Sequence, residues 1–456
     1  MKSQILALLC AAAPLAAQAP ARSAAPPVRP LPAPTATSTD SLGSVAAVRQ
    51  LPNGSVLVND QARRRVVLMD SSLTVIGVVA DSTSSTANAY GVQPGGLLAY
   101  HGDSTLFIDP ASLSMLVIDG AGKVVRVMAA PRPNDVQFLI GGPFGNPGFD
   151  SQGRLIYRSF PRPNFTRDAN GNPSSPEFPD SAALVRFDLG TRKLDTATFF
   201  RIPKQNVTIT RTENGGMNIS TTINPLPVTD DWAVLSDGTI ALVRGREYRV
   251  EFLGADGSRT LADKIPFEWQ RLSDEDKAAF IDSTRAVMER RRAEFAAGGG
   301  AAGAAGAGGN VTFGGGDGGG RQQVITMRMD GPGGGTPPRR GGADSAQGRR
   351  TNANGNNQLP PLTFVSPSEL PDYKPAFGVG SVRSDMDDRL WVRTIPTKPT
   401  TGGAVYDVID RNGKLVDRVQ VPADATIAGF GKGGVVYVGI RDGKELRLQR
   451  VRLNMN

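Results

Sequence analysis

The sequence predicts an all-β protein, a six-bladed β-propeller with one helical and glycine-rich insertion between blades four and five. The stretch 44–80 divides into four short apolar strands joined by polar turns, and similar units recur about five more times along the 456 residues. The Asn53-Gly54 turn joins the first two strands, and this dipeptide is a strong hairpin signal because both residues tolerate positive φ. A repeat of about 40–50 residues holding four strands is typical of propeller blades, which bury their faces only against neighbouring blades.

Each expected blade is recognised by short apolar strands separated by Asx-Gly or Gly-Gly turns. The last unit shows three clear strands, and a segment around Asp40–Val48 either completes it or starts the first blade. In the first blade the expected strands are Val45–Arg49, Val56–Asn59, Val66–Met69 and Val75–Val79. The expected blades cover 44–80, 92–130, 148–200, 232–257, 377–421 and 427–453, within a propeller at 41–453.

The N-terminus predicts export. Lys2 precedes the apolar run Ile5–Ala17 and the small-residue site Ala17-Gln18-Ala19, so residues 1–21 are expected to be a signal peptide. Residues 22–40 are rich in Pro and Ala and are expected to form a linker. The one cysteine, Cys10, lies in the leader, so the mature chain would contain no disulfide. We therefore expect a periplasmic or extracellular protein.

Long interruptions occur at only two kinds of connection, from the second to the third strand and from one blade to the next. In an up-and-down blade both kinds emerge on one side, so this elaborated side is where binding is expected. Residues 206–224 are expected to form an extra hairpin, and the insertion 264–375 to hold a helix at about 273–296 and a disordered glycine-rich tract at about 297–358. The interruptions are 159–182, 204–229, 264–375 and 395–403.

Several classes of function are disfavoured. The only histidine, His101, lies in a tight turn, which argues against Ser-His-Asp hydrolysis and against zinc. No phosphate-binding P-loop motif occurs, and after the leader no run of about 18 apolar residues could span a membrane. Nucleic acid is not expected as a partner, because the arginines of 321–350 lack an aromatic platform. We expect a monomer.

Basic residues supply the first candidate site. The formal net charge is +8, and several arginines follow second strands on the elaborated side. Guanidinium groups suit carboxylate or phosphate ligands, although a solvated basic rim would produce the same pattern. The candidate ligand-binding residues are Arg158, Arg244, Arg246, Tyr248 and Arg393, with Trp232 as further aromatic support.

Carboxylates supply an alternative site. Asp60 and Asp109 end second strands on the elaborated side and could hold Ca²⁺ or another divalent cation. As turn residues they could equally accept hydrogen bonds from loop amides. Three further carboxylates near first strands are weaker candidates for the same role: Asp150, Asp231 and Asp385. The main interpretation needs no cofactor.

Three stretches resemble exported bacterial six-bladed β-propeller proteins of the NHL-like group. They are WAVLSDGTIALVRGREYRVEFL at 232–253, PDYKPAFGVGSVRSDMDDRLWVRT at 371–394 and YDVIDRNGKLVDRVQVP at 406–422. The resemblance implies the fold and a binding or scaffolding role. In gluconolactonase-type relatives of this architecture, a divalent metal lies in the central channel.

Two functions from different classes follow. The first is an exported, non-enzymatic scaffold that binds an anionic small molecule or an envelope protein. The alternative is a metal-dependent hydrolase, lactonase or lyase with its site at the central channel. A purely structural spacer is the third interpretation.

Overall fold

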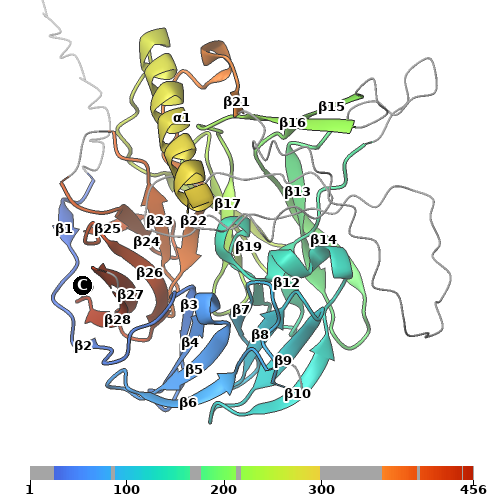
Figure 1. Ribbon diagram of the computed structural model, residues 1–456, viewed down its shortest axis with the longest axis vertical. Coiled ribbons are helices and arrows are strands. Elements are labelled where there is room, and N and C mark those ends of the chain that lie inside the picture. Colours follow the sequence, from blue (N-terminus) through green and yellow to red (C-terminus); the bar gives the residue numbers. More distant parts are fainter. Residues whose placement is uncertain are drawn as a thin grey trace, which may run out of the picture.

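The computed structural model is dominated by four-stranded antiparallel sheets that follow one another along the chain (Figure 1). In the first five of these sheets four strands pair in chain order, first with second, second with third and third with fourth, so each is largely a local unit. The sixth takes its fourth strand from the N-terminal segment. The structure describes residues 25–83, 88–164, 176–211, 217–297, 362–397, 401–443 and 445–454.

The first three sheets come from the N-terminal half of the chain. The first sheet holds β3 (Ala47–Gln50), β4 (Val56–Asp60), β5 (Arg65–Met69) and β6 (Val75–Ala80). The second holds β7 (Gly96–Ala99), β8 (Thr105–Asp109), β9 (Ser114–Ile118) and β10 (Val124–Ala129). The third holds β11 (Gly148–Phe149), β12 (Leu155–Arg158), β13 (Ser181–Phe187) and β14 (Leu194–Arg201).

The other three sheets of this kind complete the described set. The fourth holds β17 (Asp231–Val234), β18 (Ile240–Arg244), β19 (Arg249–Leu253) and β20 (Arg259–Lys264). The fifth holds β22 (Phe377–Ser384), β23 (Leu390–Thr394), β24 (Val405–Ile409) and β25 (Leu415–Gln420), with β1 (Val28–Pro30) added outside β25. The sixth holds β26 (Ala425–Gly431), β27 (Val435–Asp442) and β28 (Glu445–Arg452), with β2 (Ala36–Thr37) outside β28.

Apolar side chains on both faces of the sheets form the core. All five residues of β4 and of β8 are buried, as expected for strands covered on both sides. Six apolar clusters fill the spaces between successive sheets in the described structure, and one, which includes Val58 and Tyr437, joins the sixth sheet to the first. First strands lie beside one another, as β3 does with β7 and β26, and β17 with β22. This arrangement is a β-propeller.

The turns show why Asx-Gly pairs in the sequence predict the ends of strands. Gly54 has a φ of 86°, and the Asn53 side chain accepts a hydrogen bond from the N–H of Ser55. Gly238 has a φ of 84°, and a Cβ there would lie 2.3 Å from the Asp150 Cα of the preceding sheet. Glycine is therefore required at this position both for the turn and for the close approach of two sheets.

The N-terminal segment differs from the expected linker at 22–40. The strand β1 pairs in parallel with β25, and β2 pairs with β28 as the outer strand of the sixth sheet (Figure 1). Arg29 adds an ion pair of 2.5 Å to Asp417. The sequence did not reveal these strands because they are only two or three residues long and lie in a proline-rich segment. Further along the same segment, Leu42 forms an isolated antiparallel β-bridge with Leu446 of the sixth sheet. The first sheet starts at Ala47.

The insertions form a separate layer on the elaborated side. The hairpin expected at 206–224 is present as β15 (Asn206–Arg211) and β16 (Met217–Ile223), and β21 (Thr363–Phe364) pairs with β16. The helix α1 (Asp274–Ala297) begins after Ser273, whose hydroxyl accepts from the Asp276 N–H. Figure 1 shows α1, β15, β16 and β21 together at the top of the view.

The helix α1 is attached to its layer through a small apolar cluster. Ile281 of α1 packs with Leu226, Val365 and Leu370, the last of which follows the 3₁₀ turn η5 (Pro367–Glu369). None of the helices in the described ranges is long and apolar enough to cross a membrane. The expected signal peptide at 1–21 and, beyond its first residue, the glycine-rich tract at about 297–358 lie outside the described residues.

Ser38 should be important for the N-terminal attachment. Its buried hydroxyl accepts a hydrogen bond of 3.0 Å from the Leu448 N–H of β28. We expect Ser38→Ala to lower the free energy of unfolding by about 1–3 kcal/mol, because a buried donor loses its acceptor. Urea denaturation measures this, with the exposed neighbour Thr39→Ala as the control. Equal effects of the two substitutions would contradict the assigned role.

Candidate anion-binding site

Arg158 occupies the end of β12, a strand whose four residues are all buried. Side chains alternate along a strand, so Arg158 shares a face with Ile156, which packs against the fourth sheet, while Tyr157 packs against the second. Because the side chains alternate, the Arg158 guanidinium group lies between the third and fourth sheets, where an apolar side chain would be expected.

Aromatic rings surround this guanidinium group. Its Cζ lies 5.1 Å from the centre of the Phe138 ring, 5.3 Å from that of Phe144 and 5.9 Å from that of Phe200. Phe138 lies in the 3₁₀ segment η2 (Pro133–Leu139) and Phe144 in η3 (Gly142–Phe144), both in the connection between the second and third sheets. Cation–π contacts of this kind contribute about 0.5–2 kcal/mol each, more when water is excluded.

The hydrogen-bonding capacity of Arg158 is unused within the described structure. The residue is 5% exposed, its Nε is buried without a partner, and no described group accepts a hydrogen bond from it. Burial lowers its pKa to about 10, while the charge of Asp231 acts in the opposite direction. Arg158 is still protonated at neutral pH, so the site holds a cation without a hydrogen-bonded counter-ion.

Asp231, the first residue of β17, is an opposite charge that acts on Arg158. It is 3% exposed and accepts backbone hydrogen bonds of 2.9 Å from Trp232 and from Val382 of β22. It therefore ties the fourth sheet to the fifth. Burial raises the pKa of Asp231 to about 7, although the backbone donors and Arg158 favour the ionised form.

Arg383 of β22 extends this group of charges. Its Nη1 donates 2.8 Å to the carbonyl oxygen of Ile427, and burial lowers its pKa. The charge of Asp231 acts on Arg383 as it does on Arg158, favouring the protonated guanidinium group in both. Sequence reasoning missed Arg383, although it is the one charged residue in the stretch FGVGSVRS of an otherwise uncharged first strand.

The other expected ligand residues lie outside this group. Arg244 forms ion pairs of 2.8 Å with Asp230 and 2.6 Å with Glu251, and Arg246 is exposed in the next turn. Arg244 is therefore engaged in ion pairs, unlike Arg158. Its charge is neutralised by two carboxylates that belong to the same sheet and the segment leading into it.

Tyr248 is also not positioned to contact a ligand. It is completely buried in the apolar cluster between the fourth and fifth sheets, and its hydroxyl donates 2.7 Å to Asp407. Arg418 donates 3.0 Å to the same carboxylate. Tyr248 has a φ of 46°, a left-handed conformation that the surrounding packing must maintain. Its role in the structure is to join two sheets.

Asp60 and Asp109 hold loops in place. Asp60 is completely buried and accepts hydrogen bonds from the N–H groups of Gly43 and Ser44 and from Arg65. Asp109 accepts from the Ala111 N–H and the Ser112 hydroxyl. Among the described residues no three His, Cys, Asp or Glu side chains gather as metal ligands would. Protein donors thus engage oxygens of both carboxylates, which is the turn role that the sequence offered as the alternative to a cation site.

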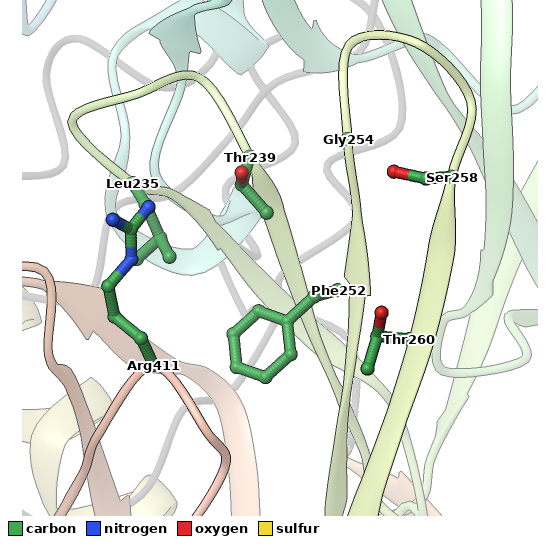
Figure 2. A pocket seen from close by; sticks show the side chains of 7 residues that line it. All are labelled: Leu235, Thr239, Phe252, Gly254, Ser258, Thr260 and Arg411. Atoms are coloured by element: carbon green, nitrogen blue, oxygen red, sulfur yellow. The ribbon is translucent and has the colours of Figure 1, made fainter.

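A cavity of about 440 Å³ opens on the elaborated side, where the insertions after β12 and β14 begin. The exposed cations Arg162 and Lys204 line it together with Glu177, and Phe178 forms a buried apolar part of its wall. A second cavity, of about 250 Å³, lies on the opposite side, at the turns of the fourth and fifth sheets (Figure 2).

Comparison with known proteins identifies no family for this chain. No family model and no curated protein sequence matches the chain. Among solved structures, a putative exported protein from Bacteroides fragilis aligns with 92% of this chain and 93% of its own, at 10% identity and a TM-score of 0.40. Similarity at this level identifies neither a ligand nor a reaction.

Two further structures are similar to the same extent. A putative gluconolactonase covers 92% of this chain and 94% of its own, at 10% identity and a TM-score of 0.35. An inactive virginiamycin B lyase from Staphylococcus aureus with quinupristin covers 91% of this chain and 98% of its own, at 8% identity and a TM-score of 0.35.

Tyr248→Phe should destabilise the protein without affecting ligand binding. Removal of the hydroxyl leaves the buried Asp407 with one donor fewer, which costs about 1–3 kcal/mol. Thermal denaturation and anion titration of the same variant measure the two effects. A variant with unchanged stability and impaired binding would show that Tyr248 contacts the ligand after all.

Asp231 should make the stability fall as pH rises. Its pKa is about 7 in the folded protein and 3.8 ordinarily, so the folded state binds the proton more tightly. The resulting stabilisation is complete below the ordinary pKa and is lost as pH rises through about 7. We expect the wild type to lose on the order of 3 kcal/mol more than Asp231→Asn between about pH 5 and about pH 8. Urea denaturation at both pH values tests this, and parallel changes in the two proteins would contradict it.

Proposed function

We propose that this protein is an exported six-bladed β-propeller of the NHL-like kind that binds a small anion through Arg158. The observation that carries the proposal is a nearly buried guanidinium group without a hydrogen-bond acceptor in the described structure. Buried polar groups are almost always hydrogen-bonded, so a persistent exception calls for an explanation such as a missing ligand. A carboxylate or phosphate group would supply the missing acceptors.

The surroundings of Arg158 favour binding over a purely structural role. Low local polarity strengthens a charge-assisted hydrogen bond, and the planar guanidinium group can engage two oxygens at once. The rings of Phe138, Phe144 and Phe200 hold the side chain in place, so little conformational entropy is lost on binding. Since Arg158 is only 5% exposed, a small anion fits the site better than an envelope protein does.

The electrostatics set the pH range for binding. An incoming anion is repelled by ionised Asp231, which interacts with Arg158. Protonation of Asp231 near its pKa of about 7 removes this repulsion. Binding should therefore be strongest below neutral pH, where Arg158 is fully charged.

A second candidate is an enzyme, a hydrolase, lactonase or lyase with its site near the inner strands. The observation in its favour is Asp231, because a carboxyl with a pKa of about 7 suits general acid–base catalysis. Dependence on a divalent cation has no support from Asp60 or Asp109, whose oxygens are engaged by loop donors and, at Asp60, by an arginine. Turnover of a lactone that is lost in Asp231→Asn and unaffected by EDTA would favour this candidate.

Arg158→Met should weaken anion binding strongly and leave the fold at least as stable. The substitution removes the charge but keeps an apolar stem against the rings, so affinity for inorganic phosphate or acetate should fall about 10- to 100-fold. Isothermal titration measures affinity, and a thermal melt measures stability.

Arg244→Met is the matched control for this experiment. It breaks the ion pairs with Asp230 and Glu251, so we expect a lower melting temperature and unchanged anion affinity. If Arg158→Met binds both anions as tightly as the wild type, or if the wild type binds neither, the proposed function is wrong. A lower melting temperature in Arg158→Met without a change in affinity would assign Arg158 to the fold alone.

A further inference from the structure

The cavity of about 250 Å³ lies on the side of the propeller opposite the insertions, where short turns of the fourth and fifth sheets meet. Leu235 and Thr239 flank the turn between β17 and β18, Gly254 and Ser258 flank the turn between β19 and β20, and Arg411 comes from the turn between β24 and β25. Its volume is below that of sites for drug-sized ligands, so it would accept about one ring.

An aromatic ring forms the apolar part of the cavity. In the view of Figure 2 the Phe252 ring stands between Arg411 and Thr260, with Leu235 nearby. Phe252 is half-buried and packs against the cluster between the fourth and fifth sheets, so its position is fixed by the core. The face of such a ring carries negative charge density and attracts the C–H groups of a flat, partly apolar ligand.

Hydroxyl groups form the polar part. Thr239, Ser258 and Thr260 line the same cavity; in Figure 2 the Thr260 hydroxyl lies near the Phe252 ring, and the hydroxyls of Thr239 and Ser258 lie closer to the turns. The Ser258 hydroxyl donates 2.6 Å to Asp256 and still has lone pairs to accept with. Thr260 is exposed, and no described group forms a hydrogen bond with its hydroxyl.

The turns around the cavity are held before any ligand arrives. Asp388 accepts 2.7 Å from the Ser236 N–H and 2.9 Å from its hydroxyl. Arg411 pairs with Asp237, and Arg186 of the third sheet donates 2.8 Å to the Gly254 carbonyl oxygen. Preorganised walls reduce the entropy lost on binding.

The charges at the rim disfavour an anion. Asp237 and Asp256 lie on turns that form the cavity, and the guanidinium group of Arg411 is already shared between Asp237 and Asp388 of a neighbouring turn. A neutral ligand with many hydroxyls avoids this repulsion and can donate to the carboxylates. The ligand expected at this cavity is therefore neutral, whereas the ligand expected at the Arg158 site is an anion.

We propose that this cavity binds one neutral sugar ring, with a C–H face against Phe252 and hydroxyls bonded to Thr239, Ser258, Thr260 and the rim carboxylates. The inference is independent of the proposed function, because the two sites share no residue and take ligands of different charge.

Titration of the full chain with D-glucose, D-galactose and N-acetyl-D-glucosamine, followed by ligand-observed NMR and calorimetry, tests the proposal. We expect weak, saturable binding of at least one of the three sugars. Phe252→Leu, which keeps an apolar side chain, and Thr260→Val, which keeps the shape, should each weaken it about 3- to 10-fold.

Thr196→Val is the matched control, because Thr196 is exposed on β14, the outer strand of the third sheet, as Thr260 is on β20 of the fourth. This variant and Arg158→Met should bind the sugar as the wild type does. The proposal is overturned if none of the three sugars binds, or if Phe252→Leu and Thr260→Val bind as tightly as Thr196→Val. Binding that is lost in Arg158→Met alone would place the sugar at the anion site.

Discussion

Each described sheet of the propeller has two apolar faces, and that single constraint determines the architecture. A strand such as β4, buried along its whole length, cannot lie at a surface, so each sheet needs a neighbour on both sides. The apolar clusters between successive sheets satisfy this need, and the cluster shared by Val58 and Tyr437 satisfies it for the sheets at the two ends of the chain. A ring is the arrangement that leaves no apolar face exposed.

The sequence predicted the sheets because their signals are local. Turns such as Asn53-Gly54 and Asp237-Gly238 mark strand ends through backbone conformations that few residues adopt. The attachment of β1 and β2 could not be predicted in the same way, because two or three residues carry no periodicity. Their partners, Arg418–Gln420 and Gln449–Arg450, are roughly 400 residues away in the sequence, and only tertiary structure reveals this pairing.

The candidate site was predictable only in part, for a related reason. From the sequence, Arg158 and Arg244 were equal candidates, because each is placed where a second strand ends. Their environments separate them: Arg244 meets two carboxylates, whereas Arg158 meets rings contributed by η2, η3 and the distant β14. The Tyr248 hydroxyl, also a candidate from the sequence, donates to Asp407 of the next sheet. A side chain's partners depend on contacts between sheets, which local sequence does not encode.

The burial of Arg158 is costly in a way that packing alone does not explain. Removing a charge from water costs several kcal/mol, and three cation–π contacts of about 0.5–2 kcal/mol each offset that cost only in part. An apolar side chain would fill the same space between the sheets without any desolvation of charge. A residue that lowers the stability of an otherwise consistently packed structure is expected where function opposes stability. The guanidinium group therefore makes most sense as one half of an interaction that an anion completes.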